Sequence, residues 1–215
     1  MIPGTTMFSL TPLWRAGVDA ATLLRRLADN GCGPAVELIG HQAWRGFPEL
    51  STTDERAFRD AVDRGGLHPV ALGVYTDLYR RPGRAMTADE AFADIRPQLR
   101  AAARLGFPVV RTALGMDPTL LRRVHAEAAA LGVVLTFEIQ GATPPGAPSI
   151  VDVLALREST GSPYLGFTVD FSLTTPALPD SFATALRRKG LRGDEVRTVF
   201  HAWESGTPVG GHSGA

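Results

Sequence analysis

Short apolar runs alternate along this chain with longer amphipathic segments, and this alternation limits the possible fold more than any other feature. The runs are rich in Val, Leu and Phe and cover residues 7–13, 35–40, 69–74, 108–114, 133–139 and 165–171. They are apolar through most of their length rather than at every second position, as is typical of strands covered on both faces. The pattern predicts six parallel strands connected by helices.

The segments between the runs carry Leu, Ala and Val at every third or fourth position, as amphipathic helices do. They cover residues 19–31, 52–66, 87–106, 117–132 and 147–161. Three N-terminal caps are expected, at Thr52 with Glu55, at Thr87 with Glu90, and at Asp117 before Pro118. Four glycines stand where a left-handed C-cap is expected: Gly31, Gly65, Gly106 and Gly132. Pro97 should kink or split the third helix.

Strands of this kind fit both a doubly wound sheet and a TIM-type barrel. A unit of helix, Leu-Gly and apolar strand recurs at Leu105-Gly106 and Leu131-Gly132, which indicates one repeated supersecondary unit. No GxGxxG or GxxxxGK[ST] motif follows a run, and these motifs are the usual nucleotide-binding signatures of doubly wound folds. We therefore expect an α/β fold of the TIM (β/α)8 type.

This barrel should be incomplete, with about six β/α units, because such barrels typically have about 250 residues and eight strands. The chain has 215 residues. After the sixth run, residues 181–190 and 194–206 have helical spacing, and the last residues are rich in glycine without periodicity. We expect an incomplete barrel domain over residues 1–190, followed by a helical segment and flexible tail over residues 191–215.

The charge pattern argues against nucleic acid and membrane partners. The formal net charge is zero and the basic residues are scattered, whereas binders of polyanions concentrate positive charge. No apolar run approaches the length of about 18 residues that spans a bilayer, and the N-terminus lacks the features of a signal peptide. We expect a cytoplasmic protein whose single cysteine, Cys32, is structural.

Two carboxylates stand at the ends of apolar runs, where barrel enzymes collect their chemistry. Glu138 follows VVLTF and Asp170 follows LGFTV. Burying an ionised carboxylate is costly unless a cation or hydrogen-bond donors compensate. Two such groups converging from neighbouring strands would suit Mg²⁺, Mn²⁺ or Zn²⁺. The alternative is that each carboxylate caps a helix or pairs with an arginine such as Arg111.

Further polar and aromatic residues stand near the ends of the runs, where they would face the mouth of the barrel. The expected substrate-binding residues are His41, Trp44, Tyr75, Arg111 and Gln140. For His41 and Trp44 the alternative is a loop or packing role. Glu37 lies nearer the middle of its run, where a hydrogen-bonded structural role and a substrate contact fit equally well.

With VELIG in the second run, LTFEIQG in the fifth and LGFTVDFS in the sixth, the chain resembles the xylose-isomerase-like TIM-barrel superfamily over roughly residues 7 to 175. This group includes sugar-phosphate isomerases and epimerases, ketose 3-epimerases and endonuclease-IV-like enzymes. Members commonly bind a divalent metal through glutamate after strand five, aspartate after strand six, histidine after strand seven and glutamate after strand eight. Glu138 and Asp170 match the first two ligands, and the other two have no counterpart. Leu173 stands where many members have a histidine.

The resemblance implies a sugar phosphate isomerase or epimerase that uses Mn, Mg or Zn to act on a carbohydrate or polyol. Glu138 would be one of two glutamates acting as acid and base while the metal polarises the substrate. Because the second glutamate has no counterpart, we expect the chain by itself to bind metal weakly and to be inactive.

Two other functions stay open. One is a non-catalytic or half-site subunit that docks against a complementing chain or a second copy through the open edges of its sheet, since edge strands expose hydrogen-bonding groups. The other is lyase or deglycosylase chemistry on the same barrel, because a fold by itself does not determine a reaction.

Overall fold

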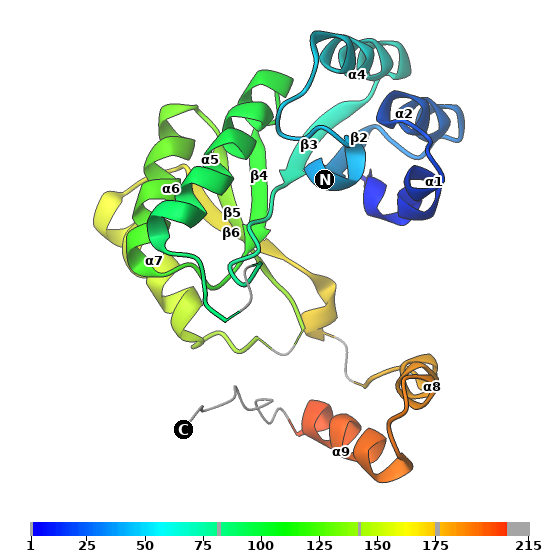
Figure 1. The fold of residues 1–215 in the computed structure, drawn as a ribbon, viewed down its shortest axis with the longest axis vertical. Coiled ribbons are helices and arrows are strands. Elements are labelled where there is room, and N and C mark those ends of the chain that lie inside the picture. Colours follow the sequence, from blue (N-terminus) through cyan, green and yellow to red (C-terminus); the bar gives the residue numbers. More distant parts are fainter. Residues whose placement is uncertain (1, 81–82, 142, 175–176, 206–215) are drawn as a thin grey trace. The chain divides into compact units, whose positions relative to one another are not determined.

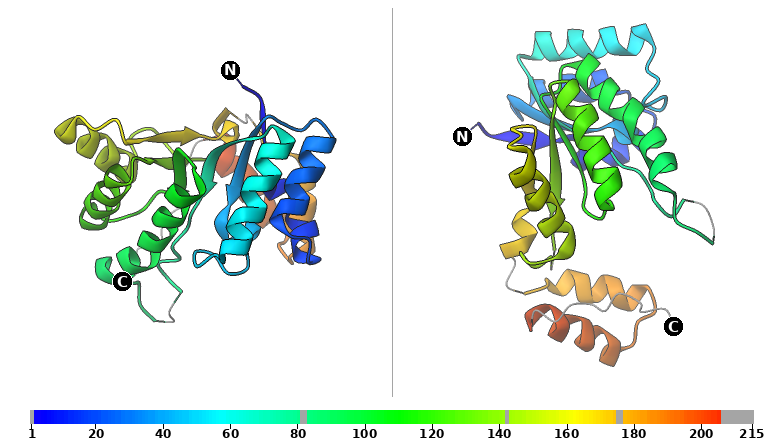
Figure 2. Two further views of the ribbon diagram at one scale, coloured as in Figure 1. Left: turned by 90° about the horizontal axis from the view of Figure 1, so that it is seen from above. Right: turned by 90° about the vertical axis from the view of Figure 1, so that its left-hand side faces the viewer.

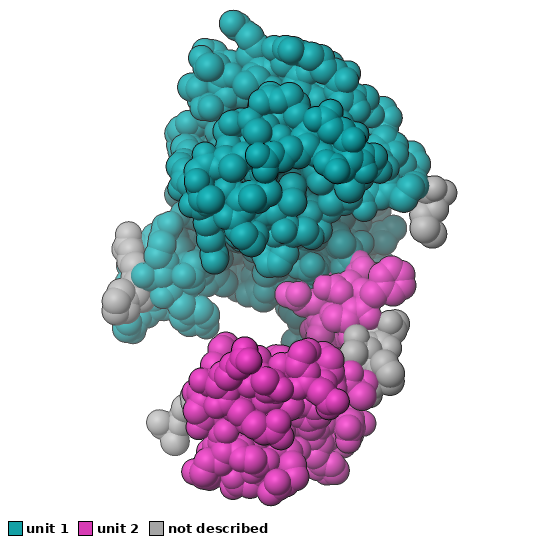
Figure 3. Space-filling view, turned by 90° about the vertical axis from the view of Figure 1, so that its right-hand side faces the viewer, with its two compact units in different colours: residues 1–138, 148–168 teal, residues 139–147, 169–215 magenta. Residues whose placement is uncertain are grey.

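The computed structural model describes residues 2–80, 83–141, 143–174 and 177–205. The chain forms two compact units (Figure 3). Unit 1 contains residues 1–138 and 148–168, and unit 2 contains residues 139–147 and 169–215. The predicted flexible tail, from residue 206, lies outside the described residues, and the predicted boundary at residue 190 stays a prediction.

Six strands form one sheet in the order β1-β2-β3-β4-β5-β6 (Figure 1). The strands are Gly4–Thr6, Ala35–Ile39, His68–Gly73, Val109–Ala113, Val134–Ile139 and Leu165–Val169. Consecutive strands pair in parallel from β1 to β5. A sheet in this order, with a helical connection after each strand, is the arrangement of a TIM-type barrel. The predicted fold class is therefore confirmed, with six strands in the described chain.

The first strand is the one element placed wrongly by the sequence pattern. β1 is only three residues long and ends at Thr6, while the apolar residues after it form the 3-10 helix η1 (Met7–Leu10) and the short helix α1 (Thr11–Arg15). The Thr6 hydroxyl accepts a hydrogen bond from the backbone N–H of Phe8 at 3.3 Å, and Pro12 occupies the first turn of α1. Proline has no N–H for a sheet and suits a helix start, so this segment turns away from the sheet.

Five longer helices follow the strands and lie beside the sheet (Figures 1 and 2). They are α2 (Ala20–Asp29), α4 (Thr52–Gly65), α5 (Ala88–Leu105), α6 (Pro118–Ala130) and α7 (Pro148–Thr160). Helix α2 packs against α4, and α5 packs against α6. Arg59 Nη2 donates to the carbonyl oxygen of Arg104 at 2.9 Å and so connects α4 to α5. The short helix α3 (Gly40–Ala43) follows β2 directly.

The predicted helix ends are confirmed for α5 and α6 and are displaced by one residue in α4. Thr87 and Glu90 form the expected capping box, and the Asp117 carboxylate accepts from two backbone N–H groups of α6. In α4 the cap is Ser51, whose hydroxyl accepts from the Asp54 N–H, and the left-handed C-cap is Gly66.

Helix α5 runs unbroken through Pro97, because tertiary packing offsets the missing hydrogen bond. Gly31, Gly106 and Gly132 have the expected positive φ.

Unit 2 contains the remaining two predicted helices. They are α8 (Asp180–Arg188) and α9 (Gly193–Glu204), preceded by the 3-10 helix η2 (Phe171–Thr174). The rings of Phe182 and Phe200 lie with centroids 6.5 Å apart and connect the two helices. In the part of the chain that the structure describes, no helix is long and apolar enough to cross a membrane.

A buried histidine connects α6 to the turn after α7. His125 is 7% exposed, and its Nε2 lies 2.8 Å from Ser162 Oγ, which also accepts from the Tyr164 N–H. Burial lowers the pKa of His125 below its ordinary value of 6.5, since removing an imidazolium from water is costly. The native protein therefore keeps this imidazole neutral.

This pairing predicts a pH-dependent stability. The unfolded chain takes up a proton on His125 more readily than the native protein, so the free energy of unfolding should fall as the pH drops below about 6.5. Denaturant titrations between pH 8 and pH 5 should show a shallower pH dependence for His125→Gln than for the wild type. The exposed His68 provides the control, and His68→Gln should retain the wild-type slope. Equal slopes in all three proteins would contradict the prediction.

Candidate active site

One face of the sheet brings polar side chains from separate strands to the same level. The register pairs Glu37 with Ala71, Gly73 with Arg111, and Arg111 with Thr136. Paired residues of parallel strands point to the same face of a sheet. The β3 residues in register with Glu37 and Arg111 are Ala71 and Gly73, and neither has a long side chain. Side chains of β2 and β4 can therefore meet across β3.

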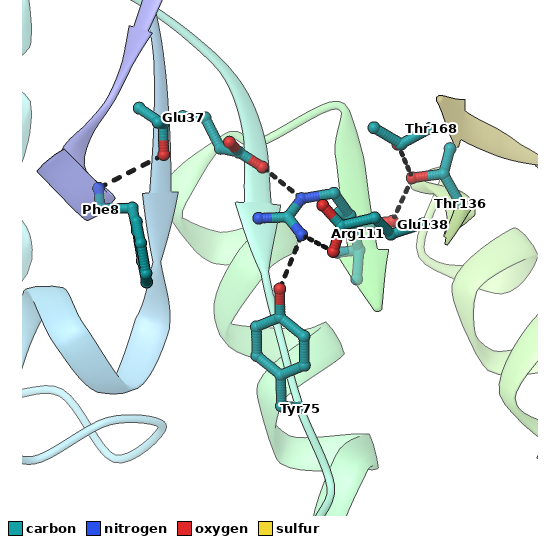
Figure 4. Close-up of polar contacts among 9 residues, drawn as sticks. Phe8, Glu37, Tyr75, Arg111, Thr136, Glu138 and Thr168 are labelled. Carbon is teal, nitrogen blue, oxygen red and sulfur yellow. Dashed lines mark hydrogen bonds and ion pairs between the residues drawn. The ribbon is translucent and has the colours of Figure 1, made fainter. Parts of the chain in front are cut away.

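Arg111 lies at the centre of this polar group (Figure 4). Its Nε donates to Glu37 Oε1 at 2.5 Å, and its Nη1 donates to Tyr75 Oη at 2.7 Å and to Glu138 Oε2. The Arg111 side chain is 8% exposed, and those of Glu37 and Glu138 are 22% and 16% exposed. We call these four residues the Arg111 cluster. It connects β2, β4, β5 and the segment after β3.

The electrostatics of the cluster keep its cation charged and its phenol neutral. Burial acts against the charged guanidinium, but the hydrogen bond and charge of Glu37, together with Tyr75 and Glu138, outweigh it and raise the pKa of Arg111. Burial, aided by the charges of Glu138 and Glu37 and opposed by Arg111, raises the pKa of Tyr75. Tyr75 accepts from Arg111, so its own O–H remains a proton donor.

The cluster contains one cation and two carboxylates, and so carries an excess of one negative charge when both carboxylates are ionised. This balance favours a ligand with hydrogen-bond donors, such as a sugar hydroxyl, or a bound cation over an anion. The polar face continues beyond it, because Thr136 Oγ1 donates to the Val110 carbonyl at 3.1 Å and lies 2.9 Å from Thr168 Oγ1.

Asp170 and Gln140 lie in unit 2. Asp170 Oδ1 accepts from the Ser172 N–H at 2.7 Å at the start of η2, and the Asp170 N–H donates to the Ile139 carbonyl at 2.9 Å. Gln140 is exposed, and its carbonyl accepts from the Thr143 hydroxyl at 2.8 Å. The substrate role of Gln140 and the metal role of Asp170 stay predictions.

The described residues contain no group of three or more His, Cys, Asp or Glu side chains that could hold a metal ion. Glu138 Oε2 and Asp170 Oδ1 already accept hydrogen bonds, which leaves Glu138 Oε1 and Asp170 Oδ2. Carboxylate oxygens are suitable ligands for Mg²⁺, Mn²⁺ and Zn²⁺. Each of these two carboxylates, taken by itself within its own unit, has donor chemistry that suits the predicted metal, and the described residues contain no complete set of ligands around either one.

His41 and Trp44 belong to an aromatic group after β2. The exposed His41 lies edge-on to Phe47, with ring centroids 5.1 Å apart. Trp44 is 7% exposed, stacks on Phe47 and meets the edge of Phe58. Gly40 permits this packing, because a Cβ there would lie 2.4 Å from the Phe47 ring. Both residues are held by packing, and a substrate contact by either stays a prediction.

The sequence left the role of Glu37 open, because a structural role and a substrate contact fitted equally well. Its partner, Arg111, lies 74 positions away. A signal was present, since each is a lone charge within an otherwise apolar strand: AVELI in β2 and VVRTA in β4. Opposite charges in buried strands of one sheet predict an ion pair.

The chain is similar to several known proteins, although no family model matches it. The chain is 32% identical over 213 residues to a C-glycoside deglycosidase alpha subunit from Microbacterium trichothecenolyticum, and 37% identical over 207 residues to one from Arthrobacter globiformis. It is also 32% identical over 179 residues to a 3'-dehydrocarminate deglycosidase alpha subunit from a Microbacterium species. These alignments cover 97%, 94% and 83% of this chain, but only 58%, 56% and 51% of the relatives.

Solved structures share the fold at low sequence identity. A 3-keto-D-glucoside 4-epimerase from E. coli aligns with 79% of this chain and 70% of its own, at a TM-score of 0.53 and 16% identity. A D-psicose 3-epimerase from Clostridium cellulolyticum aligns with 80% and 65%, at a TM-score of 0.54 and 14% identity. The chain has the fold of the xylose-isomerase-like barrels. The expected resemblance is thus confirmed at the level of fold, and in this barrel the Arg111 cluster lies on β2, β4 and β5 and just after β3.

The pairing within the cluster predicts a large effect of removing its cation. Arg111→Met leaves two poorly solvated carboxylates without a counter-charge, and should lower the free energy of unfolding at pH 7 by about 3 kcal/mol. The triple variant Arg111→Met, Glu37→Gln, Glu138→Gln should recover about half of the loss, because it removes the unpaired charges as well. Denaturant titration at pH 7 measures each value.

Arg64 is the matched control, because it pairs with Asp60 at 3.1 Å while 77% of its side chain is exposed. Arg64→Met should cost less than about 1 kcal/mol. Equal costs for Arg64→Met and Arg111→Met would show that the cluster is not a buried ionic centre.

Proposed function

We propose that this chain is the barrel part of a C-glycoside deglycosidase alpha subunit, which cleaves a carbohydrate from its aglycone in an assembly with a complementing chain. The observation that carries the proposal is identity of 32% to 37% over most of the chain to subunits of that description. Because the chain spans little more than half of those relatives, the activity of a whole subunit belongs to the proposal. The Arg111 cluster supplies groups that such a reaction needs.

The proposed chemistry starts from a sugar that carries a ketone, as the name 3'-dehydrocarminate indicates for one relative. A proton on the carbon beside the ketone is acidic, and the Glu138 carboxylate removes it. The electrons of that C–H bond move onto the carbonyl oxygen, where the Tyr75 hydroxyl and Arg111 stabilise the negative charge. They then return to form a C=C bond as the bond to the aglycone breaks, and the aglycone takes up a proton.

Arg111 has the central part in this arrangement. Through Nη1 it holds both Glu138 and Tyr75, and through Nε it is itself held by Glu37. A base and a proton donor fixed by the same guanidinium keep their separation when substrate enters, which lowers the cost of orienting them.

A divalent Mn, Mg or Zn ion belongs to the proposal as the group that would polarise the substrate carbonyl when bound. Glu138 in unit 1 and Asp170 in unit 2 are its predicted ligands, and further ligands would come from outside the described residues. A complementing chain or second copy that pairs with the end strands β1 and β6 is one source of such ligands, since an unpaired strand edge favours pairing.

A sugar isomerase or epimerase is the second candidate. The fold shared with two sugar epimerases supports it, and its reaction also begins with removal of a proton beside a carbonyl group. The two functions differ in the product, because an epimerase leaves every carbon–carbon bond intact.

The deciding experiment offers a 3'-dehydro C-glycoside and Mn²⁺ to the protein purified from the cells that make it, in the assembly it forms there. Mass spectrometry of the products should detect the free aglycone. Glu138→Gln should lower the rate of release by about 100-fold or more, and Tyr75→Phe by about tenfold. Tyr79, whose side chain is exposed, is the control, and Tyr79→Phe should leave the rate unchanged. An epimeric sugar without free aglycone would support the second candidate instead.

Metal binding by the isolated chain should be weak. We expect a Kd for Mn²⁺ of about 10⁻⁴ M or weaker by calorimetry, because two carboxylates make an incomplete site. Glu138→Gln and Asp170→Asn should each abolish the remaining heat, and Glu158→Gln, an exposed change on α7, should not. Tight binding that survives both site variants would place the metal elsewhere.

A further inference from the structure

A cavity of about 330 Å³ lies in unit 1 between the N-terminal ends of α2 and α4, and none of its lining residues belongs to the Arg111 cluster. Its volume is at the lower end of the range of about 300–1,000 Å³ that small-molecule sites occupy. The space exists because small residues line it from four segments: Gly17, Ala20, Ala21, Ala43, Gly46 and Ala57. Two tryptophans, Trp14 and Trp44, also line it.

A flat platform borders this cavity. The guanidinium of Arg45 lies over the ring of Trp14, with Cζ 4.7 Å from the ring centroid. Arg45 Nη2 also donates to the Trp14 carbonyl at 3.0 Å, which keeps the two side chains in place. A guanidinium has two flat faces, so a planar ring can stack on the face that Trp14 leaves open.

The charges around the cavity select against an anionic ligand. Helix N-termini attract anions, but a carboxylate already lies at each of the two helix starts. Asp19 caps α2 through the Thr22 N–H, and Asp54 lies in the first turn of α4, where its Oδ2 accepts from the Ser51 hydroxyl. Arg45 is the one positive side chain among the lining residues. The remaining acceptor, Asp54 Oδ1, and the remaining Arg45 donors fit a hydroxylated, uncharged ring.

We propose that this cavity binds the planar phenolic aglycone of the substrate, stacked on the Arg45–Trp14 platform with its hydroxyl groups toward Asp54 and Arg45. The inference rests on the proposed function, because it assigns the second half of a C-glycoside. An aromatic ring gains more from an aromatic and guanidinium platform than a sugar of the same size does.

The cavity and the Arg111 cluster are formed by neighbouring parts of the chain. Glu37 lies in β2, and Ala43 to Gly46 come directly after β2 and α3. The segments that follow the strands of a TIM-type barrel surround its catalytic end. The sugar would thus lie at the Arg111 cluster over the sheet, with the aglycone at the rim formed by the segments after β1 and β2.

Calorimetry with apigenin, a planar trihydroxyflavone, tests the proposal on the full chain. Apigenin should bind with one site per chain, and flavone without hydroxyl groups should bind about tenfold more weakly. Ala57 is exposed, so Ala57→Phe should block the cavity without disturbing the core, and should weaken apigenin binding about tenfold or more. Ala126→Phe, at an exposed position of α6, is the matched control and should bind like the wild type.

Fluorescence gives a second readout. The chain has three tryptophans, and in Trp203→Phe the two that remain both line the cavity. Apigenin should quench their emission, and Ala57→Phe should prevent the quenching. Undetectable binding, unchanged binding by Ala57→Phe, or tighter binding of methyl β-D-glucoside than of apigenin would each overturn the proposal.

The two proposals fail separately. Aglycone release that Ala57→Phe leaves unchanged would overturn the aglycone site while the deglycosidase function stands. Flavone binding in this cavity by a protein that releases no aglycone would support the site and count against the function.

Discussion

A guanidinium that is 8% exposed is stable inside a sheet only with counter-charges beside it, because the desolvation of a charge costs several kcal/mol. Arg111 meets this requirement with carboxylates from β2 and β5 and a phenol from the segment after β3. The same requirement constrains the register of the strands. A shift of β4 by one residue would turn Arg111 to the opposite face of the sheet and leave Glu37 and Glu138 unpaired. The cluster is therefore both an ionic connection between strands and a determinant of their alignment.

The small residues of β3 make this connection possible. Ala71 and Gly73 stand in register with Glu37 and Arg111, so the ion pair crosses a strand that presents no long side chain. The consequence for function is that Glu138 and Tyr75 are held by one rigid group at the end of the sheet where barrel enzymes act. Small residues shape the second site in the same way, since alanines and glycines between α2 and α4 leave room beside two tryptophans.

Local patterns predicted most of the fold correctly, for reasons visible in single residues. Thr87 and Asp117 cap their helices as expected, because a cap depends on residues only two or three positions apart. The errors came where two local signals competed. Residues 7–13 have an apolar composition typical of a strand, yet Pro12 and the Thr6 cap favour helical turns there. In α4, Ser51 and Thr52 are both suitable caps, and it is Ser51 that has the extended backbone of a cap and accepts from the Asp54 N–H.

The sequence by itself determined the alternation of strands and helices, the absence of the GxGxxG and GxxxxGK[ST] motifs, and the presence of lone charges in otherwise apolar strands. These are properties of neighbouring residues, and hydrophobic periodicity reports them directly. Only the tertiary structure decided which charges meet. Glu37 and Glu138 lie 74 and 27 positions from Arg111, and their contact depends on strand order, register and the missing side chain at Gly73. For Glu138, predicted as a metal ligand and base, the structure supplied the partner that sequence reasoning had weighed only as an alternative.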